Sequence, residues 1–235
     1  MHLYPINLNL VDILCVIVGG GNVALRKARA LIEAGARVRV ISPEVVGQIE
    51  SLAEKKQLEW FSRKFADGDL KGAFMVYAAT DNREVQATVA KQAAASGALL
   101  NSADDPEGSH FHVPAHFRRG EILVTVSTGG GSPALARKLR ESLETVISPE
   151  YEGVLDLLAW IRTEVLRVGG ESERNREIFR ALLDQGLVSL VLEAKWFDLQ
   201  MLLVRVLPDE IDSSQFLKKF LEKYDSFENM QDPLP

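Results

Sequence analysis

The sequence predicts an α/β protein, with an open parallel sheet at its N-terminal end and a helical C-terminal end. Three observations support this class. β-like and helix-like runs alternate over the first hundred residues, as a parallel sheet with crossover helices requires. A turn with three glycines joins the first strand to the first helix. From residue 151 onward the apolar residues recur mainly with helical spacing.

The expected N-terminal strands are short apolar runs bounded by glycine, proline or polar residues. They lie at 13–18, 36–42, 58–61, 73–80 and 98–104. Helices are expected at 23–34, 45–56 and 83–96. Gly35 and Gly97 stop the first and the last of these helices. The order gives βαβ units, whose crossovers are almost always right-handed.

The second half of the chain changes pattern. Residues 110–128 predict two strands joined by a turn around Arg119 and Gly120. Five helices are then expected, at 133–147, 151–168, 173–184, 187–194 and 213–224. We expect residues 225–235 to fray.

Composition narrows the class of protein. With 235 residues, of which 46% are hydrophobic, the chain is long enough for one large or two small domains. The apolar run 13–18 is too short to span a bilayer and no basic region precedes it, so we expect no signal peptide, no membrane contact and a cytoplasmic location. The net charge of -6 argues against nucleic-acid binding. Cys15 stands alone, which excludes an internal disulfide and indicates a buried thiol.

The first glycine turn predicts a Rossmann-type dinucleotide site. Gly19, Gly21 and Ala24 fit the pattern G-x-G-x-x-A between a strand and a helix. Gly19 permits the tight turn, Gly21 lets a pyrophosphate approach the backbone, and Ala24 lets helix and strand pack closely. Exposed N–H groups at the helix start favour the phosphates. The alternative is a turn of small residues that only packs a βαβ unit.

The end of the second strand bears on which dinucleotide binds. A ribose-binding acid is expected there, but the chain has Ser42, Pro43 and Glu44. The Ser42 hydroxyl and the backbone at Pro43 and Glu44 are candidates to hold the ribose. Because no arginine follows at once to pair with a 2′-phosphate, we expect NAD as the cofactor rather than NADP.

The segment 101–116 follows a strand and carries two adjacent acids and three histidines. Catalytic groups of open α/β sheets gather beyond the carboxyl ends of the strands, so Asp104 is a candidate general base. An Asp-Asp-Pro turn that only caps the strand is the alternative. His110 and His112 would share one face of a strand, but ordinary histidines are expected there and at His116, and no metal site is predicted.

A second glycine turn, in "VSTGGGSPALARK" at 126–138, has no following strand to complete a second βαβ unit. Ser132 is placed to cap the next helix, and Pro133 suits its first turn. Exposed N–H groups there suit a substrate carboxylate. The candidate substrate-binding residues are Thr128, Gly129, Gly130, Ser132 and Arg137.

Basic residues are frequent around that turn. Five of them lie between 114 and 140 against the single acid Glu121, namely Arg118, Arg119, Arg137, Lys138 and Arg140. They would suit an acidic ligand, and the alternative is a solvated helix face.

Four segments together resemble the precorrin-2 dehydrogenase family of sirohaem biosynthesis. They are "PINLNLVDILCVIVGGGNVALRKARALIEAGARVRVISPE", "VYAATDNREVQ", "NSADDPEGSHFHVPA" and "VTVSTGGGSPALARKLRESLE". The similarity covers about residues 1 to 150, and the rest matches only in being helical. The resemblance implies NAD-dependent oxidation of precorrin-2 to sirohydrochlorin, with ferrous iron insertion as a second activity of some members.

The resemblance also implies roles for particular residues. The catalytic aspartate of the family falls on Asp104. Its NAD contacts fall on Asn22 and Val23 and on Pro43 and Glu44. A serine that can be phosphorylated in sirohaem synthases is replaced by Thr128, which leaves that modification open.

Family members are homodimers in which the segment after the Rossmann domain intertwines with its partner. We therefore expect a NAD-binding domain at 1–113, a β/α dimerisation segment at 114–150 and a helical C-terminal domain at 151–235.

Our hypothesis places the nicotinamide near Thr80 and Asn101. Precorrin-2 then loses a hydride, and Asp104 assists the accompanying proton loss. Two alternatives remain. One is a sirohydrochlorin ferrochelatase, alone or in addition. The other is a non-enzymatic nucleotide sensor, which leaves the Asp104 segment and the second glycine turn unexplained.

Overall fold

The computed structural model describes residues 3–103, 105–169 and 172–224. Asp104 and the predicted frayed end at 225–235 lie outside the described residues. The chain divides into two compact units, Met1–Val113 and Pro114–Pro235.

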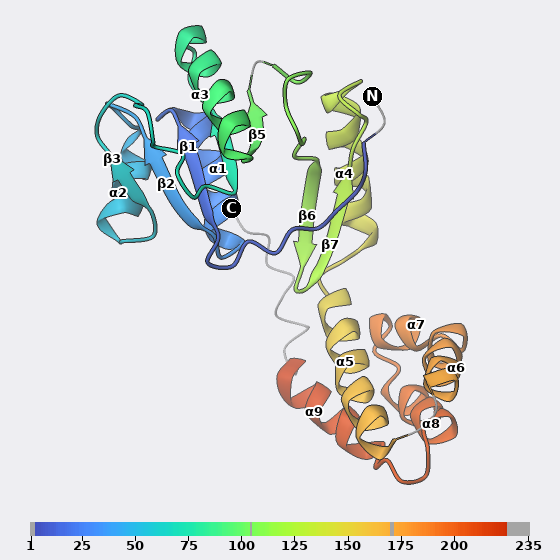
Figure 1. The fold of residues 1–235 in the computed structure, drawn as a ribbon. Helices are drawn as coiled ribbons and strands as arrows, with labels where there is room; N and C mark the ends of the chain where they lie inside the picture. The colour runs from blue at the N-terminus through green and yellow to red at the C-terminus, as the bar shows by residue number, and fades with distance from the viewer. Residues whose placement is uncertain (1–2, 104, 170–171, 225–235) are drawn as a thin grey trace. The chain divides into compact units, whose positions relative to one another are not determined.

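The first unit contains a five-stranded parallel sheet (Figure 1). Its strands are β1 (Leu14–Val18), β2 (Arg37–Ile41), β3 (Glu59–Phe61), β4 (Met75–Ala78) and β5 (Leu99–Ser102). The strand order is β3-β2-β1-β4-β5, so the direction of winding reverses between β1 and β4. Ligands of open α/β sheets bind at such a switch point, beyond the carboxyl ends of the strands.

Three helices cover the two faces of this sheet. They are α1 (Asn22–Glu33), α2 (Gly47–Glu54) and α3 (Arg83–Ser96). Side chains of β1 alternate between the faces: Cys15 and Ile17 pack in the core that includes α1 and α2, and Val16 and Val18 in the core that includes α3. Cys15 is fully buried, as predicted, and burial raises the pKa of its thiol to about 11.

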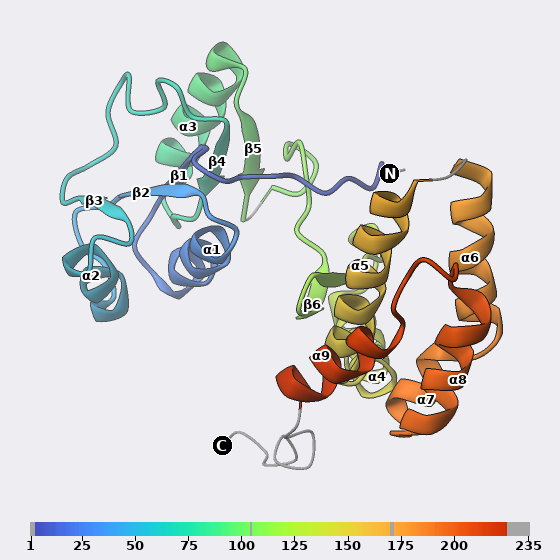
Figure 2. The same ribbon diagram turned by 90° about the horizontal axis from the view of Figure 1, so that it is seen from below.

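The second unit begins with an antiparallel hairpin of β6 (Ala115–Arg119) and β7 (Ile122–Val126), against which α4 (Pro133–Val146) packs. Gly120 turns the hairpin with φ 53°, a conformation that favours glycine. Five helices follow (Figure 2). They are α5 (Tyr151–Val168), α6 (Ser172–Asp184), α7 (Leu187–Leu192), α8 (Trp196–Val206) and α9 (Ser214–Tyr224).

The five helices share a hydrophobic core of their own. Leu157 and Ile161 of α5 and Phe220 of α9 are fully buried in it. The parallel sheet, the β/α segment and the helical end together confirm the predicted α/β fold class.

Two local predictions were wrong. Helix α8 was not expected, because apolar residues occur on all of its sides: Leu199 is buried, whereas Phe197 and Met201 are exposed. His110 and His112 do not share a strand, since β6 begins only at Ala115.

Candidate functional site

The first glycine turn joins β1 to α1, and its glycines do different things. A Cβ atom added at Gly19 would overlap the carbonyl oxygen of Ala79, and φ at Gly19 is 126°. One added at Gly20 would overlap the carbonyl oxygen of Glu44. One added at Gly21 would meet no described atom within 4 Å. Gly19 and Gly20 therefore let neighbouring loops close on the turn, and Gly21 leaves open space beside it.

The start of α1 leaves its first amides available. Gly21 is the N-cap residue, no side chain of the described residues caps it, and the first turn contains no acid. The first amide bonded back along the helix is that of Leu25, to the Gly21 carbonyl at 3.0 Å. The N–H groups of Asn22 and Val23 thus point out of the helix end, where the dipole favours an anion.

The starts of α3 and α4 are capped by side chains, whereas those of α2, α5, α7 and α8 share with α1 the lack of a side-chain cap from the described residues. The Asn82 side chain accepts hydrogen bonds from Glu84 N and Val85 N at the start of α3. Ser132 accepts one from Leu135 N at the start of α4, as predicted. The start of α1, next to the open side of Gly21, therefore fits a pyrophosphate better than these two do.

The loop after β2 is tied to the glycine turn. Gly19 N donates to Ile41 O at 3.0 Å, and Val46 N donates to Gly20 O at 2.9 Å. Within the loop, the Ser42 hydroxyl donates to Glu44 O at 2.6 Å. Its hydrogen is therefore engaged, and a ribose hydroxyl would have to donate to Ser42 rather than accept from it. Gly20 was not predicted as a site residue.

Thr80 and Asn101 lie beyond and at the carboxyl ends of β4 and β5, which are adjacent strands. The carbonyl of Thr80 accepts a hydrogen bond from Gln86 Nε2 at 2.5 Å. The Asn101 amide donates to Phe111 O at 2.9 Å, so it fastens the segment after β5. The sheet brings both residues to the edge that carries the glycine turn.

The predicted base Asp104 lies outside the described residues, but its flanking segment is described. Ser102 N donates to the Ser109 hydroxyl at 2.9 Å, and Leu100 N donates to His110 Nδ1 at 3.1 Å. His110 N donates back to Leu100 O at 2.8 Å. The His110 ring thus takes a place in the backbone pairing along β5.

The other two histidines also contact backbone oxygens, His112 that of Pro106 at 3.2 Å and His116 that of Pro114 at 3.0 Å. Within the described ranges, no group of three or more histidine, cysteine or acidic side chains could hold a metal ion.

A half-buried lysine was not predicted as a site residue. Lys27 of α1 lies with its Nζ 5.1 Å from the ring centre of Tyr77, and the Phe111 ring meets Tyr77 edge-on at 5.5 Å. Burial lowers the pKa of Lys27 and raises that of Tyr77. The stack joins α1, β4 and the segment after β5, and only the fold brings these three together.

The second glycine turn is closed by its own side chains. The Thr128 hydroxyl accepts from Ser132 N and donates to Ser132 O, both at 3.1 Å. Gly129 and Gly130 have φ of 60° and 88°, which glycine adopts without strain. Thr128 therefore shapes the turn, and phosphorylation would remove the hydrogen that it donates to Ser132 O.

The cations near this turn are more compensated than the sequence suggested. Arg137 pairs with Glu141 at 2.9 Å, and this hydrogen bond lowers the pKa of Glu141. Arg140 and Arg119 both pair with Glu144. Arg118 and Lys138 form no ion pair with any described residue. The predicted excess of positive charge is therefore reduced by acids one turn further along α4.

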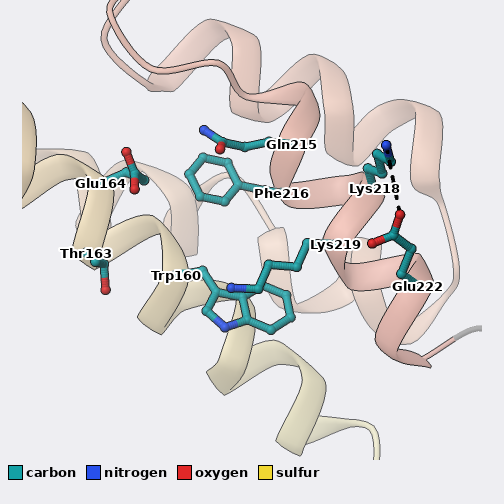
Figure 3. A pocket seen from close by; sticks show the side chains of 8 residues that line it. All are labelled: Trp160, Thr163, Glu164, Gln215, Phe216, Lys218, Lys219 and Glu222. Carbon is teal, nitrogen blue, oxygen red and sulfur yellow. Dashed lines mark ion pairs between the residues drawn. The ribbon is translucent and has the colours of Figure 1, made fainter.

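The helical part contains a cavity of about 430 Å³ between α5 and α9 (Figure 3). The Lys219 ammonium lies 4.2 Å from the ring centre of Trp160, and Lys218 faces Glu222 at 4.0 Å. None of the predicted site residues lines this cavity.

The fold and the uncapped α1 start define a nucleotide-binding α/β protein. Residues 6–115 match the family described as putative NAD(P)-binding. The chain is 37% identical to the siroheme synthase of Chromobacterium violaceum over 192 residues, 82% of this chain and 41% of that one. It is 37% identical to the siroheme synthase of Methylococcus capsulatus over 204 residues, 87% of this chain and 43% of that one. The chain thus spans less than half the length of these relatives.

A solved structure named SirC, precorrin-2 dehydrogenase, matches 94% of this chain and 100% of its own, with a TM-score of 0.71 and 26% identity. Together these matches confirm the resemblance to the precorrin-2 dehydrogenase family that was drawn from the four motifs. No helix among the described residues is long and apolar enough to cross a membrane.

Proposed function

We propose that this protein oxidises precorrin-2 to sirohydrochlorin in sirohaem biosynthesis, with NAD⁺ as the oxidant. The observation that carries the proposal is the uncapped start of α1 beside the open side of Gly21. The names of the relatives, siroheme synthase and precorrin-2 dehydrogenase, supply the substrate. A cytoplasmic location stays a prediction.

The residues around the turn fit a dinucleotide in three places. The amides of Asn22 and Val23 bind the pyrophosphate, with Gly19 and Gly21 shaping its approach. Ser42, Pro43 and Glu44 bind the adenosine ribose. Thr80 follows β4, the strand next to β1 at the switch point, and Asn101 lies on β5, the neighbour of β4; both border the nicotinamide. When bound, NAD⁺ supplies the hydride acceptor.

Asp104 is proposed as the general base. The oxidation removes one hydride and one proton from precorrin-2, and the Asp104 carboxylate takes the proton. The support is its place in the sequence, two residues after β5 ends at Ser102, where catalytic groups of such sheets gather.

The second glycine turn is proposed to receive the carboxylates of precorrin-2. Thr128 and Ser132 hold the turn in shape, Gly129 and Gly130 leave its backbone accessible, and Arg137 lies one turn into α4. Because Arg137 is paired with Glu141, substrate carboxylates have to compete with that acid. Replacing Thr128 and Ser132 by bulky residues should raise the KM for precorrin-2, and an unchanged KM would contradict this role.

A homodimer is proposed through the segment 114–150, between the NAD-binding domain at 1–113 and the helical domain at 151–235. Four apolar side chains, between 37% and 68% exposed, form a stripe along α4. They are Leu135, Leu139, Leu143 and Val146. An exposed stripe of this size favours contact with another protein surface.

The direct test is incubation of the purified protein with precorrin-2 and NAD⁺. We expect NADH and the spectrum of sirohydrochlorin, and no reaction with the Asp104→Ala variant. Anaerobic addition of Fe²⁺ to sirohydrochlorin then tests the ferrochelatase alternative. A chelation spectrum would extend the function, and its absence would restrict the protein to dehydrogenation.

A further inference from the structure

The end of β3 borders the loop that is proposed to bind the adenosine ribose. Ser42 N donates to Phe61 O at 3.2 Å, and the Trp60 indole donates to Ser42 O at 3.0 Å. The Ser62 hydroxyl donates to Pro43 O at 3.1 Å. Residues directly after Ser62 therefore start beside the place where a 2′-hydroxyl, or the 2′-phosphate of NADP, would lie.

Arg63 is the residue after Ser62, and its guanidinium is engaged elsewhere. It donates two hydrogen bonds to the Asp69 carboxylate, of 2.7 Å and 2.6 Å, and it also donates to Lys64 O at 3.1 Å. Asp69 is only 9% exposed and also accepts from Ala66 N at 2.8 Å. Because the buried Asp69 carboxylate accepts hydrogen bonds from both Arg63 and Ala66 N, it fixes the position of the Arg63 guanidinium.

The other guanidinium in this region is engaged as well. Arg39 of β2 pairs with Glu59 of β3 at 2.8 Å and lies 4.8 Å from the ring centre of Phe61. Arg63 lies 5.3 Å from the same ring centre. Both guanidinium groups near the Phe61 ring are thus compensated by carboxylates of the same unit.

We propose that Asp69 sets the preference for NAD over NADP by holding Arg63 away from the ribose loop. A 2′-phosphate needs a free arginine fork for recognition, and here that fork is occupied by an acid. The proposal rests on the proposed dinucleotide site and adds the residue that selects between its two possible ligands.

The test is titration of the full chain with NAD⁺ and with NADP⁺. We expect the wild type to bind NAD⁺ about tenfold more tightly or better, on the scale of a charge-assisted hydrogen bond. Asp69→Asn keeps the shape of the side chain but removes its charge and one of its two acceptor oxygens, so Arg63 is held by at most one uncharged hydrogen bond and can turn to a phosphate. The ratio of the Kd for NADP⁺ to the Kd for NAD⁺ should then fall by about fivefold or more, mainly through tighter NADP⁺ binding.

Two further variants assign the effect to Arg63. Adding Arg63→Gln to Asp69→Asn should abolish the gain in NADP⁺ affinity. Glu59→Gln is the matched control, because it weakens the pairing of Arg39, which lies inside β2 rather than directly after the residue that bonds the ribose loop. The ratio should stay within about twofold of the wild type. Thermal unfolding of each variant verifies the fold. Arg63→Gln alone gives a second test, which can be made even if Asp69→Asn does not fold. It should change neither the affinity for NAD⁺ nor the affinity for NADP⁺.

Several results would overturn the proposal while leaving the dinucleotide site intact. One is a wild type that prefers NADP⁺, and another is an unchanged ratio in folded Asp69→Asn. A gain in NADP⁺ affinity that persists without Arg63, or that appears equally in Glu59→Gln, would overturn it as well. So would weaker binding of either nucleotide by Arg63→Gln alone. If the wild type binds neither nucleotide, the proposed function itself fails, and this proposal with it.

Discussion

Two neighbouring glycines should respond to alanine in opposite ways. At Gly20 the added methyl group would overlap Glu44 O and come within 2.9 Å of Ser42 Oγ and of Val45 Cα. At Gly21 it would meet no described atom within 4 Å. Gly20→Ala should therefore disturb the fold of the turn, and Gly21→Ala should disturb only what binds beside it.

The magnitudes follow from these contacts. At Gly20 the Glu44 carbonyl oxygen lies 2.0 Å from the added methyl group, so the loop has to retreat by about 1.4 Å to reach the 3.4 Å of ordinary contact. Such overpacking costs about 1–3 kcal/mol of unfolding free energy. Gly21→Ala should cost less than about 1 kcal/mol, for a poorer helix N-cap. Blocking one charge-assisted hydrogen bond to the pyrophosphate costs about 1.5–3 kcal/mol, which is roughly tenfold to hundredfold in the Kd for NAD⁺.

Urea unfolding and calorimetric titration with NAD⁺ measure the two effects separately. The expected pattern is a stable Gly21→Ala variant that binds NAD⁺ weakly and a less stable Gly20→Ala variant. A Gly21→Ala variant with wild-type affinity for NAD⁺ would refute the assignment of the open side of the turn to the pyrophosphate.

Three further predictions concern single side chains. Thr128→Val should lower the unfolding free energy by about 1–2 kcal/mol, because both bonds to Ser132 are lost, whereas Thr128→Ser should keep most of it; equal losses in urea unfolding would contradict this. Leu139→Lys should give monomers by light scattering, whereas Thr145→Lys, at an exposed position of the same helix outside the stripe, should not; a Leu139→Lys dimer would rule out the α4 stripe as the interface. Cys15, whose pKa is about 11, should hold only about one thiolate in 1,000 molecules at pH 8 and should resist iodoacetamide until the chain unfolds; rapid alkylation of the folded protein, seen by mass spectrometry, would contradict its burial.

Local signals in the sequence were enough for several features. Strand, glycine turn and helix are encoded within residues 13–34, and the structure places β1 and α1 there. Ser132 and Pro133 also predicted the start of α4, because capping involves only residues three positions apart. Such features need no knowledge of the rest of the fold.

Other features depended on distant parts of the chain. Gly20 is required because the loop at Glu44 closes on it, and that approach exists only after β1 and β2 have paired. Likewise, Arg63 and Asp69 meet only because the chain folds back after β3. Neither relation has a sequence pattern that would reveal it.

One error was avoidable from the sequence. The predicted positive charge between 114 and 140 left out Glu141 and Glu144, which lie on the same predicted helix. Arg137 and Glu141 are four residues apart on that helix. That spacing is typical of an ion pair on a helix surface. Continuing the count along the helix would have lowered the expected positive charge.

The most direct test of the whole account is the formation of NADH from precorrin-2 and NAD⁺, measured side by side for the wild type and Asp104→Ala, together with NAD⁺ affinity. We expect NADH and sirohydrochlorin from the wild type alone, with equal NAD⁺ affinity in both proteins. Absence of NADH from a wild type that binds NAD⁺ would contradict the proposed reaction, and wild-type turnover by Asp104→Ala would contradict the proposed base.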